Sequence, residues 1–197
     1  MTTVLPARDP AYILAGGRSS RFGSDKARAM LEGRPLIRRI ADMLEARGHR
    51  VVAVARDADR YADLGIETIA DIEPDLGPIG GLETALAHRL QTNGPGWAVL
   101  ISCDLLNPTT EMLGTLESLR ERSPEADAVA FKDDRWQPFP GLYHTRLLDR
   151  LHTVPARSLQ KLLSGARAAT AEAPKGLRQA NRPSDLEAFE ENPDFPA

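Results

Sequence analysis

The stretch Tyr12-Ile13-Leu14-Ala15-Gly16-Gly17-Arg18-Ser19-Ser20-Arg21-Phe22-Gly23-Ser24-Asp25-Lys26 decides the fold. Residues 12–15 form a short apolar run that predicts a strand, and the glycine pair that follows ends it. A glycine-rich, polar loop directly after a strand is where open α/β sheets bind ligands, beyond the carboxyl ends of their strands. The stretch therefore predicts a first strand and a ligand-binding loop.

Apolar runs and helical patterns alternate over the first two-thirds of the chain, which predicts an α/β fold with a mostly parallel sheet flanked by helices. Helices are expected to end at Gly48, to begin at Pro78, and to begin after an N-cap at Asn107 with Pro108 in the first turn. Beyond the first strand, this part of the chain is expected to form strands over 50–55, 67–70 and 97–102.

The pattern changes after residue 124, where two strands are expected to pair around a turn at 132–135. We interpret residues 1–197 as one domain with a nucleotide-binding half over about 11–110 and an acceptor-binding half over 111–190. Residues 191–197 are expected to form a loose tail. The elements expected in the second half are strands 126–131, 136–143 and 168–173 and helices 145–151, 158–163 and 184–190.

Composition narrows the class of protein. The chain of 197 residues is 42% hydrophobic and carries a net charge of −3, so no large basic field favours nucleic acid as a partner. No apolar run approaches the roughly 20 residues that span a bilayer, and the first ten residues contain no signal-peptide core. The single cysteine, Cys103, fits a reducing compartment, and we expect a buried, unreactive thiol. We expect a cytoplasmic protein with no membrane partner.

The glycine-rich loop has the chemistry of a phosphate site. Gly16 and Gly17 let the backbone approach a phosphate closely, and Ser19 adds a hydroxyl donor. Arg21 and Lys26 add positive charge that suits a triphosphate. The loop matches neither the dinucleotide fingerprint nor the P-loop. The residues expected to contact a nucleotide along this stretch are Leu14, Ala15, Gly16, Gly17, Ser19 and Lys26.

Two aspartates follow predicted strands. Asp104 comes just after the apolar run 97–102, so its carboxylate is expected at the carboxyl edge of the sheet, where Mg²⁺ takes one or two carboxylates plus phosphate oxygens and water. Asp71 ends the preceding strand and is expected near the nucleotide. The glycines Gly77, Gly80 and Gly81 around Pro78 permit a tight turn and a helix start close to a base or ribose. From the residues alone, Asp104 capping a turn and Asp71 in a solvated acidic loop stay open as alternatives.

In order along the chain, these motifs resemble the molybdenum cofactor guanylyltransferases, within the nucleotidyltransferases of Rossmann-like fold. The resemblance spans about residues 11–190. It implies transfer of GMP from GTP to the terminal phosphate of molybdopterin, with or without bound molybdenum, and release of pyrophosphate. The segments that carry it are 14–26, Asp71-Ile72-Glu73-Pro74-Asp75-Leu76-Gly77-Pro78-Ile79-Gly80-Gly81-Leu82, Ser102-Cys103-Asp104, 138–143, Arg157-Ser158-Leu159 and Asn181-Arg182-Pro183-Ser184-Asp185-Leu186.

The resemblance also implies roles for single residues. Lys26, Arg21 and Asp104 form the catalytic set, and Asp104 is the ligand of Mg²⁺. Arg157 and Asn181 match family positions on the molybdopterin side, and Lys161 lies one turn from Arg157 if Ser158 begins a helix. Asp71 matches a position near the bound guanine nucleotide. Apo-molybdoenzymes or cofactor-delivery proteins are the partners expected to receive the product.

The chain departs from the family pattern at several positions. An asparagine usual after the second strand is absent from 53–57, Gln137 replaces a common histidine, and Gln179 replaces a common asparagine. Relatives that use CTP tend to carry alanine at the position of Gly16. A cytidylyltransferase, another nucleotidyltransferase acting on a phosphorylated acceptor, and a non-catalytic nucleotide or cofactor carrier therefore stay open. An NAD-dependent oxidoreductase is disfavoured because the dinucleotide fingerprint is absent.

Overall fold

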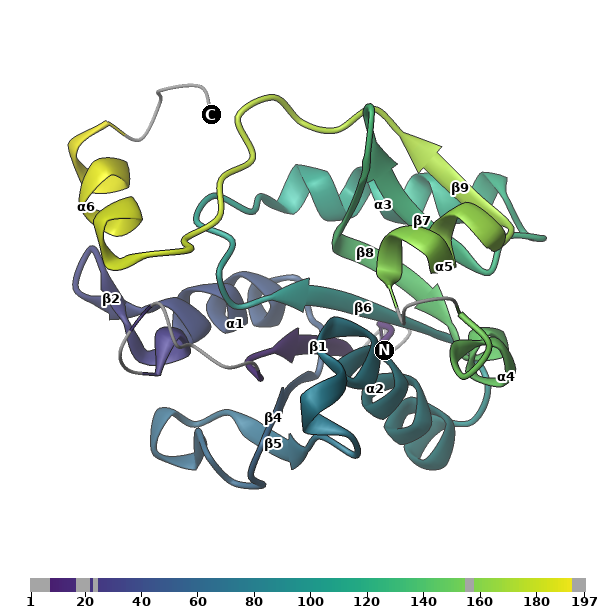
Figure 1. Ribbon diagram of the computed structural model, residues 1–197, viewed down its shortest axis with the longest axis horizontal. Helices are drawn as coiled ribbons and strands as arrows, with labels where there is room; N and C mark the ends of the chain where they lie inside the picture. The colour runs from purple at the N-terminus through teal and green to yellow at the C-terminus, as the bar shows by residue number, and fades with distance from the viewer. Residues whose placement is uncertain (1–7, 17–21, 23–24, 155–157, 193–197) are drawn as a thin grey trace, which may run out of the picture.

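A seven-stranded sheet forms the centre of the protein (Figure 1). The computed structural model describes residues 8–16, 22, 25–154 and 158–192. The strand order is β5-β4-β1-β6-β8-β7-β9, and every neighbouring pair is parallel except the two that involve β8. The strands are β1 Ala11–Leu14, β4 Val51–Ala55, β5 Glu67–Ala70, β6 Trp97–Ser102, β7 Ala128–Lys132, β8 Trp136–His144 and β9 Ala168–Ala171.

Helices cover both faces of the sheet (Figure 1). Helices α1 and α3 lie on one face, and α2, α4 and α5 lie on the other, while α6 packs at the far left of the view. The expected mixed α/β fold with a mostly parallel sheet is confirmed. The helices are α1 Leu36–Ala46, α2 Pro78–Asn93, α3 Thr110–Arg122, α4 Leu148–Leu151, α5 Leu159–Gly165 and α6 Pro183–Glu191, with short 3₁₀ turns η1 Lys26–Arg28, η2 Ala62–Leu64, η3 Pro74–Leu76 and η4 Thr145–Leu147.

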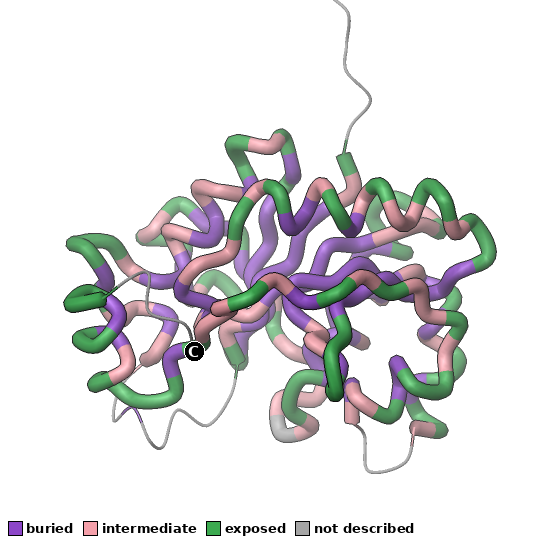
Figure 2. Tube along the Cα trace, turned by 90° about the horizontal axis from the view of Figure 1, so that it is seen from above, coloured by how far each residue is buried: buried purple, intermediate pink, exposed green. Residues whose placement is uncertain are grey.

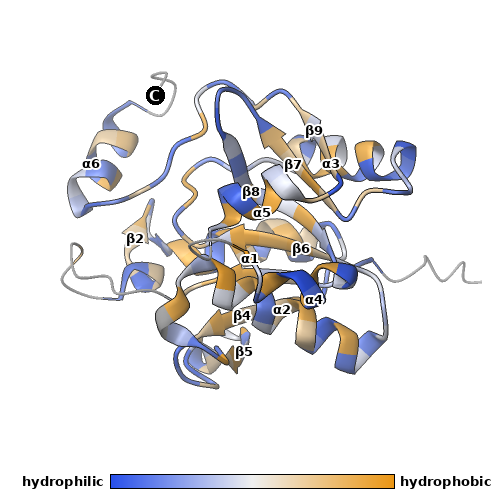
Figure 3. Cartoon of the chain, turned by 45° about the vertical axis from the view of Figure 1, so that its right-hand side comes forward, coloured by the Kyte–Doolittle hydropathy of each residue, from blue (hydrophilic) through white to orange (hydrophobic). Residues whose placement is uncertain are grey.

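The central strands are buried on both faces, as their uninterrupted apolar sequences predict. All residues of β1 and β4 are buried. Figure 2 shows buried residues at the centre of the molecule and exposed residues at its periphery, and Figure 3 shows β4 and β6 coloured as largely hydrophobic. Burial of these strands supplies the main stabilising term, because apolar burial contributes about 25 cal/mol per Å².

Most expected elements are confirmed, and β5 and β6 keep the predicted bounds. The expected start of α3 was wrong. Thr109, rather than Asn107, is its N-cap and accepts a 3.3 Å hydrogen bond from the backbone N–H of Met112. The amide of Asn107 is engaged elsewhere, since it donates to the carbonyl of Gly176 and accepts from the N–H of Arg178. A tertiary contact with the C-terminal segment therefore overrides the local capping preference.

A two-stranded hairpin, β2 Met30–Leu31 with β3 Arg34–Pro35, lies beyond the glycine-rich loop and has no counterpart in the sequence prediction. It packs into a second, smaller core that joins the loop, the hairpin, the residues after β6 and α6. The buried members of this core are Phe22, Leu31, Leu36, Leu106, Ala180, Leu186 and Phe189. The C-terminal helix is thereby fixed against the region around the loop.

Within the described residues, no helix is both long and apolar enough to cross a membrane.

The carboxylate of Asp127 ties β7 to the residues flanking β8 and β9. It is 6% exposed and accepts hydrogen bonds from Arg146 at 2.7 Å and from Arg167 at 2.9 and 3.0 Å. Burial raises the pKa of Asp127, but the hydrogen bonds from Arg167 and Arg146 outweigh burial and hold the pKa below its ordinary value. Its contribution to stability is therefore complete above the unfolded-state pKa and is lost as the pH falls through the lower folded-state pKa.

We predict that Asp127→Asn lowers the free energy of unfolding by about 1–3 kcal/mol at pH 7, which is roughly 3–8 °C in Tm. The difference from the wild type should shrink below about pH 4, because the unfolded wild-type carboxyl then binds a proton and the amide does not. Thermal melts from pH 7 to pH 3 check both parts. Asp149→Asn, at an exposed position, is the control and should leave Tm unchanged. A deficit that does not vary with pH would contradict the account.

Candidate active site

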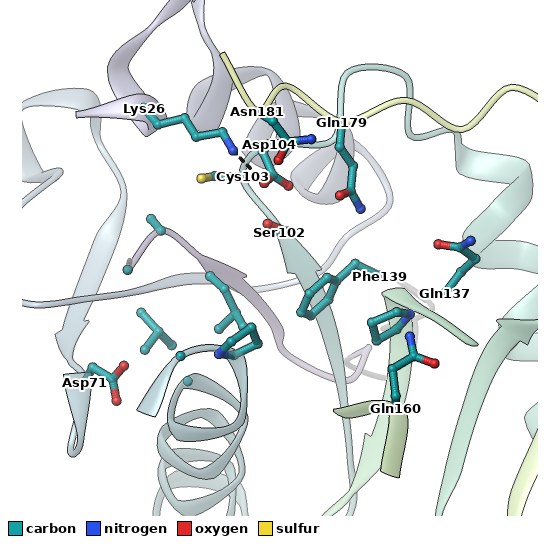
Figure 4. Close-up of a pocket in the computed structure, with 18 of the residues that line it drawn as sticks. Lys26, Asp71, Ser102, Cys103, Asp104, Gln137, Phe139, Gln160, Gln179 and Asn181 are labelled. Atoms are coloured by element: carbon teal, nitrogen blue, oxygen red, sulfur yellow. Dashed lines mark hydrogen bonds and ion pairs between the residues drawn. The ribbon is translucent and has the colours of Figure 1, made fainter. Parts of the chain in front are cut away.

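A cavity of about 810 Å³ lies at the carboxyl edge of β1, β4, β5 and β6. Figure 4 shows Asp71 on one side, Gln137 and Gln160 on the other, and Lys26 facing Asp104 between them. The described residues that line it come from the glycine-rich loop, the start of α2, the residues after β6, the start of β8 and the C-terminal segment. They include Leu14, Ala15, Gly16, Phe22, Lys26, Val54, Asp71, Gly77, Pro78, Gly81, Cys103, Asp104, Arg135, Trp136, Gln137, Pro138, Phe139, Gln160, Gln179 and Asn181.

Lys26 and Asp104 form an ion pair at the centre of this cavity. The Nζ of Lys26 lies 2.8 Å from Oδ2 of Asp104, and the two side chains are 17% and 18% exposed. Partial burial strengthens such a pair relative to one in bulk water. Asp104 follows β6 and Lys26 follows the loop after β1, as the sequence predicts.

A polar anchor fixes the residue before Lys26. The carboxylate of Asp25 caps η1 by accepting from the N–H of Ala27 at 3.1 Å, and it accepts from Nε of Arg60 at 2.9 Å. The hydroxyl of Tyr61 lies 3.3 Å from both carboxylate oxygens. Burial, together with the Asp25 charge, raises the pKa of Tyr61, so the phenol stays protonated as a donor. These contacts hold the backbone from which Lys26 extends.

Backbone hydrogen bonds fix Asp104 from two directions. The N–H of Cys103 donates to the carbonyl of Leu14 at 3.1 Å, which continues the pairing of β1 with β6. On the other side, the N–H of Ala180 donates to the carbonyl of Asp104 at 2.9 Å, and Leu105 bridges Gln179. The C-terminal segment therefore runs along the residues after β6 and brings Gln179 and Asn181 to the cavity.

Asp71 lies at the end of β5 with one oxygen engaged and the other directed to the cavity. Its Oδ1 accepts from the hydroxyl of Thr84 at 2.9 Å and from the N–H of Glu73 at 3.1 Å. Its Oδ2 has no hydrogen-bond partner among the described residues and faces the position that a Cβ on Gly16 would occupy, 3.9 Å away. An ionised carboxylate held in this way accepts donors from a ligand.

The turn before α2 requires glycine at two positions. Gly77 has φ of +61°, in the left-handed region that side chains rarely adopt. At Gly80, an added Cβ would lie 2.7 Å from the carbonyl oxygen of Glu73, so the helix could not approach this closely with any other residue. Both glycines therefore set the position of α2 beside Asp71.

Strand β8 supplies the opposite wall. It runs antiparallel to β6 with Leu100 opposite Gly141 and Trp97 opposite His144, so the start of β8 lies beside the carboxyl end of β6. Phe139 is 8% exposed, belongs to the main core and also lines the cavity (Figure 4). The side-chain amide of Gln160 is engaged at both ends, since it accepts from the N–H and donates to the carbonyl of Trp136.

Of the residues predicted from sequence, the structure gathers Leu14, Ala15, Gly16, Lys26, Asp71, Gly77, Asp104 and Asn181 around one cavity. Gly80 lies beneath it as a packing position. Gly17, Ser19, Arg21 and Arg157 lie outside the described residues. Lys161 is exposed and is not among the described residues that line the cavity, because α5 buries Leu159, Leu162 and Leu163 and leaves Lys161 toward solvent; its role toward the acceptor stays a prediction.

Arg135 and Gln160 also line the cavity and were not predicted from sequence, whereas Gly81 was expected at the helix start beside the nucleotide. The sequence marks Gln137 and Gln179, which also line the cavity, only as departures from a pattern. If the alternation of β8 extends one residue before its start, Arg135 and Gln137 share one face. The sequence does not show which face meets the site.

The donor set at Asp104 fits a hard divalent cation. Its Oδ1 is buried and has no hydrogen-bond partner among the described residues, while Oδ2 faces Lys26. In the same part of the chain, no group of three or more histidine, cysteine, aspartate or glutamate side chains gathers to hold a metal ion. A single carboxylate suits Mg²⁺ that completes its coordination with substrate phosphates and water.

Known proteins resemble this chain in both sequence and fold. The model of the MobA-like NTP transferase domain matches residues 11–173. A probable molybdenum cofactor guanylyltransferase from Deinococcus radiodurans is 38% identical over 183 residues, covering 89% of this chain and 91% of that protein. Molybdopterin-guanine dinucleotide biosynthesis protein A from Archaeoglobus fulgidus has a crystal structure with a TM-score of 0.73 and 26% identity, covering 92% of this chain and 97% of the other.

A likeness in fold extends further. The structure of CMP:2-keto-3-deoxy-manno-octonic acid synthetase complexed with CTP superimposes with a TM-score of 0.74, covering 93% of this chain and 97% of the other. Its sequence identity of 15% relates the two proteins by fold alone.

Cys103 lines the cavity but is buried, as expected from sequence. Burial, with the neighbouring Asp104 charge, raises the pKa of the thiol to about 12. Because the thiolate is the reactive form, we predict that iodoacetamide labels the native protein at least about 100-fold more slowly than the unfolded protein at pH 8. The chain has one cysteine, so mass spectrometry reports this site alone. Equal labelling rates in the native and unfolded states would contradict the assignment.

Proposed function

The chain belongs to the family of MobA-like NTP transferase domains, and on that premise we propose that it transfers GMP from GTP to the terminal phosphate of molybdopterin. The products are the guanine dinucleotide form of the cofactor and pyrophosphate. The names of the relatives from Deinococcus radiodurans and Archaeoglobus fulgidus support this substrate pair.

One observation carries the proposal: the Lys26–Asp104 pair lies between a wall that suits a nucleotide and a separate wall formed by β8. Asp71 and Gly16 lie toward β4 and β5, whereas Phe139 and Gln137 lie on the other side of β6. A site that joins two substrates needs such a junction, with the charged groups where the substrates meet.

The reaction needs positioning and charge stabilisation more than covalent help from the protein. A phosphate oxygen of the acceptor attacks the α-phosphorus of GTP, a new P–O–P bond forms, and the bond from the α-phosphorus to the bridging oxygen breaks. The electron pair leaves with pyrophosphate. Near neutral pH the acceptor phosphate is largely a dianion, since its second pKa is about 6, and no general base is required. Lys26 stabilises the negative charge that grows on the leaving group.

Asp104 is the residue that would hold Mg²⁺, through the carboxylate whose Oδ1 lacks a partner among the described residues. When bound, the ion supplies positive charge that lowers the repulsion between the two anionic reactants. Lys26 then has two roles: it orients Asp104 in the free protein and contacts phosphate in the complex.

We propose that Asp71 selects guanine. Guanine presents two adjacent donors, N1–H and the N2 amino group, which one carboxylate accepts together. Thr84 and the N–H of Glu73 hold Oδ1, so the carboxylate plane is fixed and Oδ2 is directed to the cavity. Cytosine offers one amino donor on its pairing edge, followed by the two acceptors N3 and O2, which a carboxylate repels, and this favours GTP over CTP.

We place the reaction in the cytoplasm, where GTP is supplied, and propose that the dinucleotide passes to apo-molybdoenzymes or to proteins that deliver cofactor to them.

We predict that Asp104→Asn and Lys26→Ala each reduce transfer by at least about 100-fold, because each removes charge stabilisation at the reacting phosphates. The assay mixes protein, molybdopterin, Mg²⁺ and GTP and measures pyrophosphate and the dinucleotide. Glu187→Gln, on the exposed side of α6, is the control and should retain wild-type turnover. Wild-type turnover in either site variant would overturn the role of that residue. Product from CTP instead of GTP would overturn the base assignment, and nucleotide binding without pyrophosphate release would indicate a carrier.

We predict that alanine at Gly16 affects GTP binding and not stability, whereas alanine at Gly80 affects stability. At Gly16, an added Cβ meets only ordinary contacts at 3.9 Å among the described atoms, so Gly16→Ala should keep Tm within about 2 °C. The methyl group enters the space beside Asp71 and should raise the KM for GTP by roughly tenfold. At Gly80, the 2.7 Å clash should instead lower Tm by several degrees. Unchanged GTP kinetics in Gly16→Ala would show that the base lies elsewhere.

A further inference from the structure

The charged side chains that line the cavity differ in whether they have a partner among the described residues. The charged side chains among the described lining residues are Lys26, Asp71, Asp104 and Arg135. Lys26 pairs with Asp104, and Asp71 is held by Thr84. Arg135 is exposed and forms no ion pair within the described part of the chain. Among the described lining residues, Arg135 is therefore the cation that stays available to a ligand before any substrate binds.

The backbone around Arg135 is held firmly, whereas its side chain forms no ion pair with the described residues. Its carbonyl accepts from the N–H of Asp133 at 3.1 Å, and the carboxylate of Asp133 accepts from the N–H of Ala173 at 3.2 Å. The amide of Gln160 binds both the N–H and the carbonyl of Trp136. Neither acidic neighbour in the turn, Asp133 or Asp134, pairs with the guanidinium. A cation on a fixed base loses less conformational entropy when it binds an anion.

Arg135 lies on the wall of the cavity that β8 forms, opposite the wall that carries Asp71. It immediately precedes β8, and β6 separates β8 from the strands β1, β4 and β5 that carry Gly16 and Asp71. Because β8 runs antiparallel to β6, its start lies level with the end of β6, where Asp104 follows. From one side of the sheet to the other, the cavity therefore presents Asp71, then Lys26 with Asp104, then Arg135.

We propose that Arg135 binds the phosphomonoester of the acceptor and orients it for attack. The inference rests on the proposed function, in which the acceptor reacts through its terminal phosphate. A guanidinium keeps its charge at all physiological pH values and matches a phosphate with two parallel N–H donors. Lys26 serves the nucleotide phosphates, and Arg135 balances the second anion from the opposite wall.

The test compares Arg135→Gln, Arg135→Lys and Arg122→Gln. Arg122 is exposed in the last turn of α3 and does not line the cavity, so its variant makes the same change in net charge away from the site. Initial rates are measured against molybdopterin at saturating GTP and Mg²⁺, and against GTP at saturating molybdopterin. Anaerobic calorimetry measures the Kd of molybdopterin and of GTP separately, without any turnover.

We expect Arg135→Gln to raise the KM and Kd for molybdopterin by roughly tenfold or more, with the values for GTP changed less than about twofold. Arg135→Lys should lie between glutamine and wild type because it keeps the charge and loses the paired donors. Arg122→Gln should match the wild type.

Unchanged molybdopterin values in Arg135→Gln, or equal losses for GTP and molybdopterin, would overturn the assignment. If the wild type binds molybdopterin through Arg135 but forms no dinucleotide, the transfer proposal fails and the phosphate site stands. If the wild type does not bind molybdopterin at all, both fail.

Discussion

The parallel register of β1 with β6, in which Leu14 lies opposite Ser102, is the constraint on which the site depends. Strands that run the same way end at the same edge, so the loop after β1 and the residues after β6 must meet there. The hydrogen bond from the N–H of Cys103 to Leu14 extends this register by one step and places Asp104 beside Lys26. A shift of one residue would point each side chain to the opposite face and separate the two charges.

The second core keeps this junction in place from outside the sheet. Phe22 of the glycine-rich loop and Leu106 after β6 share it with Leu186 and Phe189 of α6. The N–H of Ala180 binds the carbonyl of Asp104, so the segment before α6 contacts the site directly. The C-terminal helix therefore supports both the glycine-rich loop, which is expected to bind the nucleotide phosphates, and the segment that carries Asn181. In this way it connects the nucleotide side of the site to the acceptor side.

The sequence predicted the parts of the structure that depend on local pattern. Strand β6 is apolar from Trp97 to Ile101, so its bounds and the aspartate after it could be placed from sequence. The cap of α3 was misplaced because Asn107 bonds Gly176 and Arg178, residues about 70 positions away. Lys161 was assigned to the acceptor side from helical spacing, which gives neighbours along a helix but does not show that α5 packs inward through Leu159, Leu162 and Leu163. Arg135 was missed because only the antiparallel pairing of β8 with β6, a tertiary feature, brings the start of β8 to the site.

The most direct test of this account is the thermal stabilisation of wild type and Asp104→Asn by GTP, CTP, ATP and UTP, each with and without Mg²⁺. A ligand that binds only the folded state raises Tm in proportion to its affinity. The account predicts a shift for GTP alone, enlarged by Mg²⁺ in the wild type and not enlarged in Asp104→Asn. Equal shifts for all four nucleotides, or a metal effect that persists without the Asp104 carboxylate, would contradict it.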